Sequence, residues 1–514
     1  MNVAPLGLAA ATLPGAIPAQ RVPVSSGQYL AACRLAWERG GRLAALWASD
    51  ERERARGFLV RVALVDEDGF TVLELTLPDA DARFPDLTPI FPEANRMQRA
   101  VFDLVGVASE GEDQRPWLWL ASWPIDRFPL RHDFEASPKW EPGQEEYAFV
   151  RVTGDGVHEI PVGPVHAGII EPGHFRFQIV GEKVLRLEER LGYVHKGIEK
   201  RFEALGLAAG HRLAGRISGD STVAYAWAYA QAAEAVAAQT PPPRAAWLRA
   251  LALERERVAN HLGDLGYLGN DGGFAFGLAQ FSRLKEELLR TNLAAFGHRL
   301  LMDYVVPGGV ARDLDGDHAA AIAAEARRLA ADVALLRGIY DEHAGLQDRF
   351  RNCGHVSAEL ARKLGLTGLA ARASGSPRDL RCDFPSAPYD VLRVQPSVRG
   401  EGDVAARVAV RFDEIAESLR LIAAIVDGLP DGPVREPLPA LSRAGLAIGC
   451  VEGWRGPVLI ALDCGPGDTI RRCHPQDASW ANWPVLEHAV IGNIVPDFPL
   501  INKSFNLSYS GHDL

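Results

Sequence analysis

Five Ala- and Leu-rich stretches beyond residue 196 limit the possible folds of this chain more than any other feature. Each repeats apolar residues at the three- and four-residue spacing of one helix face, as Trp247, Leu251 and Val258 do. The stretches lie near residues 217–238, 244–268, 279–303, 316–344 and 402–428. Helices of this kind bury their apolar stripes against one another, so we expect a long helical bundle.

Mixed structure is predicted on both sides of the bundle. Residues 28–39 and 95–105 have helical patterns, the second with Asn95 as its N-cap. Alternating runs predict strands at residues 42–47, 57–65, 70–77, 147–152, 157–160, 175–180 and 183–187, with a further apolar strand at 458–462. Asp66 to Gly69 and Gly181-Glu182 are the expected hairpin turns. The expected fold class is therefore α+β.

The passage at 109–146 has the composition of a linker, with five prolines, charge runs and tryptophans at 117, 119, 123 and 140. We therefore divide the chain into an N-terminal extension (1–24), a small α+β domain (25–108), the linker (109–146) and a larger domain (147–514) that opens with β-hairpins and continues as the bundle.

Charge and cysteine usage exclude several classes of protein. A net charge of -11 disfavours nucleic acid as a partner. Long uncharged apolar runs are missing, and Met1 to Gln20 has no basic region, so we expect neither a membrane span nor export. The six cysteines form no CxxC pair, which favours the cytoplasm and leaves Cys450, Cys464 and Cys473 as buried small hydrophobic residues.

Specific motifs connect the chain with known families. Phe84 to Val107 (FPDLTPIFPEANRMQRAVFDLVGV) resembles the signature helix region of the C subunit of respiratory complex I. Six further motifs, in the same order, resemble its D subunit. They are GPVH (163–166), EPGHF (171–175), YVHKGIEK (193–200), PGGV (307–310), RASG (372–375) and DLR (379–381). The C-like then D-like order, with ANWP (481–484) and PLIN (499–502), is most similar to the large subunit of formate hydrogenlyase and related membrane-bound nickel-iron hydrogenases.

The resemblance fails at the four cysteines that hold nickel and iron in those hydrogenases. The stretch that should read RxCGxC is Arg216-Ile-Ser-Gly-Asp-Ser221, so Ser218 and Ser221 replace the first pair. Near residue 510 the second pair falls on Ser508 and Gly511. Serine hydroxyls are hard, weak ligands near neutral pH. We therefore expect no metal in this chain and expect Ser218 and Ser221 on one face of a helix that Arg216 starts.

A quinone site like that of complex I is the alternative, and here too the sequence departs from the family. The tyrosine that follows the equivalent arginine aligns with Gly219, and the histidine of the N-terminal hairpin aligns with Pro172. Neither of the two known chemistries is therefore preserved intact.

Several polar residues remain as candidates by resemblance. Arg216 matches an arginine near the terminal iron-sulfur cluster of the small subunit, and Arg455 an arginine that overhangs the hydrogenase metal site. Asp379 and Arg381 form an expected buried pair lining the same cavity, with a structural clamp as the alternative. The cavity-lining candidates are Arg216, Ser218, Asp220, Ser221, Arg372, Asp379, Arg381, Arg455 and Ser508, and the cluster-interface candidates are Arg216, His166, Glu171 and His195.

The resemblance implies the large subunit of a membrane-associated oxidoreductase, peripheral on the inner face of the cell membrane. Its implied partners are a small B-subunit-like protein with a 4Fe-4S cluster and antiporter-like and other integral membrane subunits. This chain would line the cavity beside that cluster and couple electron transfer to ion translocation. Two alternatives stay open: catalytic reduction of a bound quinone, as in NADH:quinone oxidoreductases, and a non-catalytic scaffold or assembly role.

Overall fold

A five-stranded sheet forms the first unit of the computed structural model, which describes residues 1–120, 124, 126–135, 147–167, 170–441 and 444–514. The sheet order is β1-β2-β5-β4-β3, with β2 parallel to β5 and the other pairs antiparallel. The strands are β1 (Ala11–Leu13), β2 (Ala19–Val24), β3 (Arg42–Asp50), β4 (Phe58–Asp66) and β5 (Gly69–Leu77). Residues 11–24, which we assigned to an extension, thus contribute two strands, and Val22 pairs with Leu73 in the core.

Helices α1 (Ser26–Glu38) and α2 (Ala94–Val105) pack against this sheet. The short strands β6 (Arg83–Phe84) and β7 (Ala108–Ser109) pair in parallel with each other next to α2. The predicted hairpin between β4 and β5 is confirmed. Asn95 as N-cap is wrong. The turn at Phe91 runs directly into the helix, since the amide of Ala94 donates to Phe91, and the amide oxygen of Asn95 accepts from Arg99 instead.

The described part of the expected linker packs against α2. Trp117, Leu118 and Trp119 are buried, and their three backbone amides donate to one oxygen of Asp103 at 2.6–3.3 Å. Trp123 and Trp140 lie outside the described residues. Residues 117–119 therefore belong to the packed body of the protein.

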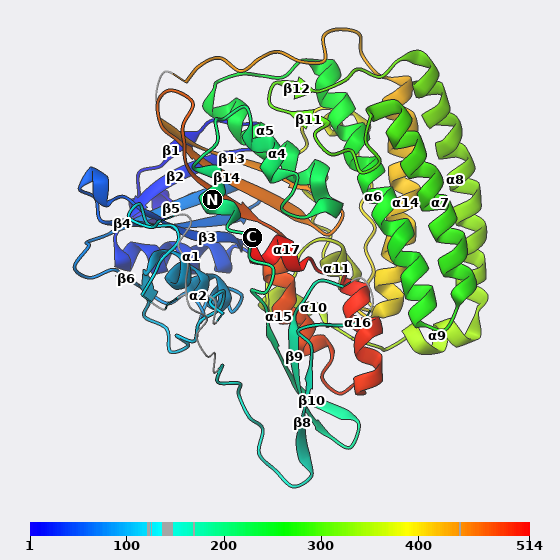
Figure 1. The fold of residues 1–514 in the computed structure, drawn as a ribbon, viewed down its shortest axis with the longest axis horizontal. Helices are drawn as coiled ribbons and strands as arrows, with labels where there is room; N and C mark the ends of the chain where they lie inside the picture. Colours follow the sequence, from blue (N-terminus) through cyan, green and yellow to red (C-terminus); the bar gives the residue numbers. More distant parts are fainter. Residues whose placement is uncertain (121–123, 125, 136–146, 168–169, 442–443) are drawn as a thin grey trace.

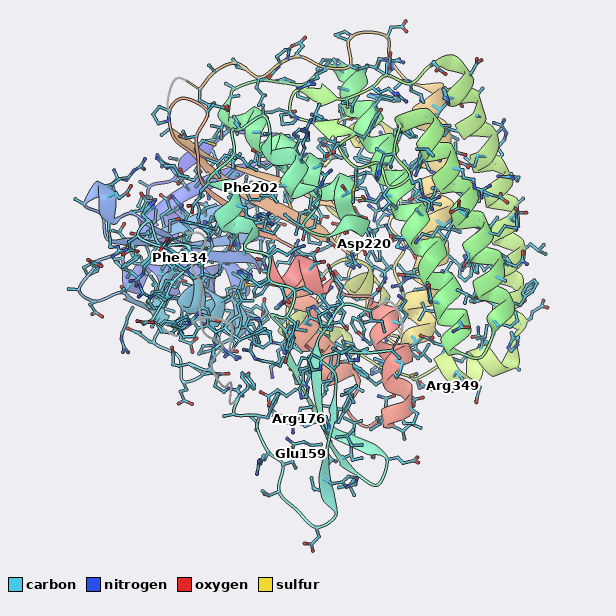
Figure 2. The ribbon with its side chains drawn as sticks, in the orientation of Figure 1. Phe134, Glu159, Arg176, Phe202, Asp220 and Arg349 are labelled. Atoms are coloured by element: carbon cyan, nitrogen blue, oxygen red, sulfur yellow. The ribbon has the colours of Figure 1, made fainter. Side chains whose placement is uncertain are left out.

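A three-stranded arm projects from the body at the bottom of Figure 1. It consists of β8 (Val157–Val162), β9 (His174–Val180) and β10 (Lys183–Arg190), and the predicted turn at Gly181-Glu182 is confirmed. Glu159 and Arg176 pair along it at 3.1 Å (Figure 2). The predicted strand at 147–152 is wrong, because the amides of Val150 and Val152 donate to the side chains of Glu188 and Gln178 rather than to a neighbouring strand.

All five predicted bundle stretches contain helices. They are α5 (Thr222–Val236), α6 (Pro243–Asp271), α7 (Ala275–Phe296), α8 (Gly316–Glu342) and α14 (Val404–Asp427). The last four pack side by side, on the right of Figure 1, whereas α5 covers the sheet of β13 (Gly445–Glu452), β14 (Pro457–Cys464) and β15 (Ile470–Gln476). Cys450, Cys464 and Cys473 are buried there without disulfides, as predicted. Helix α7 ends earlier than predicted because Gly297 adopts a φ of 83°.

Short elements complete the larger unit. The helices are α3 (Ile198–Phe202), α4 (Gly210–Ala214), α9 (Ala344–Phe350), α10 (Ala358–Lys363), α11 (Gly368–Ala373), α12 (Leu380–Asp383), α13 (Tyr389–Leu392), α15 (Ser479–Ala489), α16 (Phe498–Phe505) and α17 (Tyr509–Asp513). Strands β11 (Val305–Val306) and β12 (Gly309–Val310) pair with each other, and 3-10 turns occupy Ala4–Leu6, Arg52–Arg54, Gly219–Ser221 and Val495–Asp497. Within the described ranges, no helix combines the length and the apolar character that a membrane span needs.

Candidate functional site

The two segments that align with the hydrogenase cysteine pairs meet in the structure. The hydroxyl oxygens of Ser218 and Ser508 lie 2.8 Å apart, although 290 residues separate them in the chain. Ser221 and Gly511 lie one short turn beyond these two serines, and all three serine side chains are buried. We call Ser218, Ser221 and Ser508 the hydroxyl cluster. The two aligned segments thus converge, with hydroxyls at three of the four positions and glycine at the fourth.

Local backbone geometry explains how the serines are placed, and it corrects one prediction. Ser218 is extended, Gly219–Ser221 form a 3-10 turn, and α5 begins only at Thr222. Arg216 therefore does not start a helix, and the two serines do not share a helix face. The helix begins there because the carboxylate of Glu256 accepts hydrogen bonds from Val223 (2.7 Å) and Ala224 (3.2 Å), two amides of its first turn.

Ser508 has a structural role of its own. It precedes α17, and its hydroxyl accepts a hydrogen bond of 2.8 Å from the amide of Gly511. The Ser508 amide in turn donates to the hydroxyl of Ser479 at 2.9 Å. A thiolate would be a poor replacement for a hydroxyl in such a cap, because sulfur accepts hydrogen bonds weakly.

Arg455 and Asp220 cover the hydroxyl cluster with a bidentate ion pair (distances of 2.5 and 2.9 Å), near the centre of the molecule (Figure 2). Arg455 also donates to the hydroxyl of Ser221 at 3.2 Å, and its guanidinium lies 3.9 Å from the ring centroid of Trp454. Burial alone would raise the pKa of Asp220. The charge and hydrogen bonds of Arg455 outweigh this effect and lower the pKa to about 2.

Glu256 lies beneath this ion pair and has the opposite electrostatics. The residue is 5% exposed, and burial raises the pKa of its carboxyl to about 8, with a further contribution from the charge of Asp220. The side chain of Asn260 connects Asp220 with Glu256, because its amide group donates to the backbone oxygens of both residues. An ionised and a protonated carboxyl therefore lie close together beside the hydroxyl cluster at neutral pH.

A second buried network contains the predicted pair Asp379–Arg381, which is confirmed at 2.7 Å. Arg381 also binds Glu254 (3.0 Å), and Arg372 binds Glu414 and Glu452, both at 2.8 Å. Further members of the network are His261, Arg257, Tyr389 and Ser418. We call this set the carboxylate–arginine network.

Arg372, Asp379 and Arg381 therefore do not touch the hydroxyl cluster. The segment Glu452-Gly-Trp-Arg455 connects the two regions instead, since Arg257 donates to the backbone of Glu452 and Gly453 while Trp454 donates to the backbone of Asp220. A shift of this segment would therefore change hydrogen bonds in both regions.

The cluster-interface candidates separate into two groups. Arg216 lies on the surface, with 45% of its side chain exposed, and pairs with Asp303 at 2.6 Å. The other three surround α17 and the base of the arm. Glu171 accepts from the amide and hydroxyl of Ser510 (3.1 Å each), His195 contacts the backbone oxygen of Asp513 (2.7 Å), and His166 contacts that of Gly173 (2.8 Å). Glu171 and His195 thus position the helix that carries Ser508.

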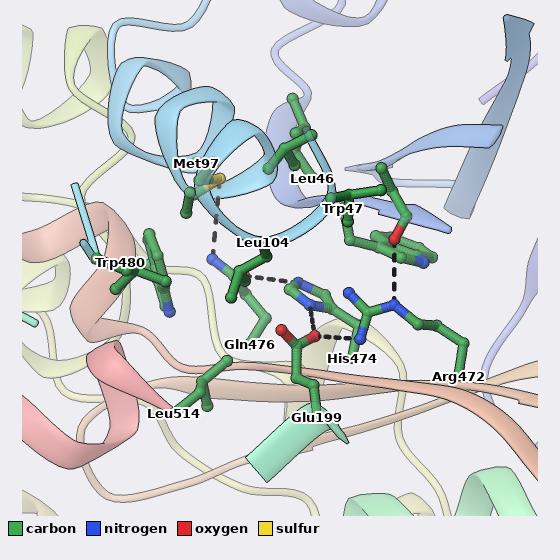
Figure 3. Close-up of a pocket in the computed structure, with 15 residues that line it drawn as sticks. Leu46, Trp47, Met97, Leu104, Glu199, Arg472, His474, Gln476, Trp480 and Leu514 are labelled. Carbon is green, nitrogen blue, oxygen red and sulfur yellow. Dashed lines mark hydrogen bonds and ion pairs between the residues drawn. The ribbon is translucent and has the colours of Figure 1, made fainter. Parts of the chain in front are cut away.

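A separate cavity lies where α2 and β3 of the first unit meet β15 and α3 (Figure 3). Its wall is mainly apolar, and one side is the triad of Glu199, Arg472 (2.6 Å) and His474 (2.7 Å). Burial alone would raise the pKa of Glu199, but Arg472 and His474 lower it to about 2. His474 also stacks on Trp47. This triad joins the two units and does not touch the hydroxyl cluster.

The residues do not fit a nickel-iron centre. In the described part of the chain no three His, Cys, Asp or Glu side chains are grouped as metal ligands. The hydroxyls that replace the thiolates already bond to one another and to Asp220. Such neutral hydroxyls lack the soft, charged donor atoms that nickel and low-spin iron require.

Sequence reasoning gave no role to several residues that build these two regions, among them Glu256, Glu414, Glu452, Asp477 and Asn506. Asp477 accepts from Tyr225 at 3.1 Å beside the hydroxyl cluster, and the backbone oxygen of Asn506 accepts from Arg455. Glu256 carried one usable signal, because it lies between Glu254 and Arg257 in a stretch of α6 (248–259) that is buried throughout.

A small α+β unit joined to a bundle whose two cysteine-aligned segments converge defines a class of protein, the fused complex I-type large subunit. The models of two families match: the respiratory-chain NADH dehydrogenase 30 kDa subunit over residues 22–139 and the 49 kDa subunit over residues 271–444.

Relatives of known name support both parts of this match. Formate hydrogenlyase subunit 5 of Escherichia coli is 31% identical, with 93% of this chain and 86% of that protein aligned. The fused C/D subunit of NADH-quinone oxidoreductase from Bacteroides thetaiotaomicron is 28% identical, with 74% and 75% aligned. A chain of the membrane-bound sulfane sulfur reductase, an archaeal respiratory membrane complex, matches with a TM-score of 0.66 and 26% identity, over 71% of this chain and 100% of that one. The chain therefore belongs to the complex I-like, hydrogenase-related family of large subunits with fused 30 kDa-type and 49 kDa-type parts.

Proposed function

We propose that this chain is the large subunit of a membrane-associated oxidoreductase that works without a nickel-iron centre. It would sit on the inner face of the cell membrane, bound to a small subunit with a 4Fe-4S cluster and to antiporter-like and other integral membrane subunits. The chain itself would hold no cofactor. Its part would be to line the cavity beside that cluster and to couple electron transfer to ion translocation.

One observation carries this proposal. The hydroxyl cluster keeps the convergence of the two ligand segments, and the pair Arg455–Asp220 fills the space above it with fixed charges. Charges in a low-dielectric site respond strongly to an added electron nearby. The link from Arg455 through Glu452 to the carboxylate–arginine network gives such a response a physical route into the bundle.

The test is purification of the intact complex from membranes, with its subunits identified and its metals measured. We expect an iron-sulfur small subunit and integral membrane subunits, nickel far below one per chain, and neither evolution nor uptake of hydrogen. Nickel near one per chain would refute the proposal. Isolation without iron-sulfur or membrane partners would favour the scaffold role, and turnover with added quinone would favour catalytic quinone reduction.

A further inference from the structure

Two adjoining cavities lie at the seam between strand β3 of the first unit and the loop that leads into α11. They share three lining residues: Arg42, Thr367 and Pro457. The second cavity reaches the surface near Asp383, which is exposed. Neither cavity contains a residue of the hydroxyl cluster, so they form a separate site.

Arg42 faces both cavities without an ion-paired carboxylate. Among the residues that the structure describes, no hydrogen-bond or ion-pair partner of the Arg42 side chain is found. Burial is the largest effect on this guanidinium and lowers its pKa; the charge of Arg378 also lowers it, whereas Cys450, Glu452 and Asp383 raise it. Arg378 lines the second cavity and is held nearby by a hydrogen bond of 2.8 Å to the backbone of Gly40. Arg42 is thus a partly buried cation without an ion pair, next to a second cation.

Thr367 presents a second unsatisfied group to the same space. The residue is 6% exposed, and its hydroxyl has no hydrogen-bond partner among the residues that the structure describes. Its backbone amide and carbonyl are both bound to the side chain of Asn482. The free hydroxyl is therefore a donor that this part of the protein leaves available, which buried polar groups rarely are.

No carboxylate of the cavity wall forms an ion pair with Arg42 in the described part of the structure. Asp379 is committed to Arg381 and Glu452 to Arg372, and neither reaches Arg42 within ion-pair distance. Asp383 lies at the exposed rim and does not reach it either. Asp477 also lines the first cavity, and the charge of Arg42 acts on the buried Glu93, but neither carboxylate pairs with Arg42. Arg42 thus offers a guanidinium without an ion pair next to a hydroxyl donor.

We propose that this seam cavity binds a small monocarboxylate anion, held by the guanidinium of Arg42 and the hydroxyl of Thr367. The planar guanidinium fork matches the two oxygens of a carboxylate. Gly368, next to Thr367, packs tightly against the backbone of Arg455, since a Cβ atom on Gly368 would overlap the backbone oxygen of Arg455. Occupancy would therefore stiffen the backbone behind the Arg455–Asp220 pair. The site goes beyond the proposed function and does not depend on it.

Calorimetric titration of the full chain with acetate tests the site, with ionic strength held constant by sodium sulfate and chloride used in a parallel titration. We expect saturable binding of acetate to the wild type. Arg42→Met should weaken it about tenfold or more, because a charge-assisted pair is lost, and Thr367→Val should weaken it severalfold. Amide exchange of residues 366–376 should slow with acetate in the wild type and not in Arg42→Met.

Arg34→Met is the matched control, because Arg34 is exposed on α1 and lines neither cavity. It should bind acetate like the wild type. Thr367→Val keeps the shape of threonine, so it tests the site even if Arg42→Met folds poorly. Equal acetate binding by wild type and both variants would mean that acetate binds elsewhere, and no binding by any of them would mean that the cavity holds water only; either result would overturn the proposal. Chloride binding as tight as acetate binding would overturn the carboxylate class.

Discussion

Replacement of thiolates by hydroxyls changes what the central residues can do. Ser218 donates to Asp220 at 2.7 Å and contacts Ser508, so its bonding capacity is used within the protein. A thiolate at either position would bring a negative charge next to Asp220, whose pKa is already low. Arg455 balances the charge of Asp220 when the neighbouring groups are neutral hydroxyls. Cysteine thiolates at these positions would require a further cation such as a metal.

A disulfide can test the convergence of the two segments directly. In the double variant Ser218→Cys/Ser508→Cys the sulfur atoms replace oxygens that lie 2.8 Å apart, so mild oxidation should join them. Peptide mapping by mass spectrometry under non-reducing conditions would detect the cross-link. The pair Ser49→Cys/Ser508→Cys, with Ser49 on strand β3, should stay reduced. Failure of the first pair to cross-link in folded protein would contradict the site.

Glu256 provides a prediction about pH. Its carboxyl has a pKa of about 8 in the folded protein against 4.5 in the unfolded chain, so the folded state holds its proton longer. The free energy of unfolding should therefore decrease as pH rises from about 4.5 to 8, by up to about 4 kcal/mol from this group. Glu256→Gln, which has no proton to lose, should remove this dependence and be more stable than wild type at pH 8.

Urea unfolding from pH 5 to 8 would measure this difference. Glu342→Gln, at an exposed position on α8, should leave the wild-type dependence unchanged. Parallel curves for the wild type and Glu256→Gln would show that Glu256 is ionised in the folded protein.

Among the elements, those with a strong local pattern were predicted well from the sequence. The bundle helices and both hairpins follow from apolar spacing and turn residues, which act within a few positions. The failures depend on distant partners. Residues 147–152 are bound by Glu188 and Gln178, and α5 begins where Glu256 binds its first amides.

The same reasoning applies to the candidate site. Ser218 and Ser508 could be identified because a family motif marks them, and the buried pair Asp379–Arg381 because it lies within one motif. Glu414 and Glu452 escaped notice, because each finds its partner Arg372 only through the packing of helix α11 against α14 and β13. Single-sequence patterns do not contain that information.

Close packing of α5 on β13 leads to a prediction at this scale. A Cβ atom on Gly449 would overlap the backbone oxygen of Ala228 in α5, whereas one on Gly445, in the same strand, would meet only Val236 at 3.6 Å. Gly449→Ala should therefore lower the free energy of unfolding by about 3 kcal/mol, and Gly445→Ala should change it little. Thermal unfolding of the two variants measures this contrast, and equal midpoints would mean that α5 can move off the sheet.

For the whole molecule, ion pairs between the first unit and the larger unit hold the two together. Arg61 binds Asp463 at 3.0 Å, and Arg96 of α2 binds Glu189 of β10 (3.1 Å) and Glu487 of α15 (2.6 Å). Arg96 also lies 4.5 Å from the ring centroid of Trp117. The first unit, the arm and the end of the chain are thus joined at one buried residue.

Arg96→Met should therefore destabilise the whole protein, by about 3–5 kcal/mol near neutral pH, because two buried carboxylates lose their cation. Glu189 is buried and Glu487 partly buried, and burial raises the pKa of both, so both can take up protons as the pH falls. The loss should consequently be smaller at pH 5 than at pH 8. Urea unfolding at both pH values measures it, with the exposed Arg34→Met as control; a loss independent of pH would mean that packing, not charge, dominates.

The distance between the two halves of the hydroxyl cluster along the chain has a consequence for synthesis. Ser508 leaves the ribosome 290 residues after Ser218, which at bacterial elongation rates is about 15–60 s later. Arg455 also follows its partner Asp220 by 235 residues. During this interval the turn at 218–221 exists on the nascent polypeptide without its hydroxyl and arginine partners. The hydroxyl cluster can therefore form only near the end of synthesis, after Ser508 has been added to the chain.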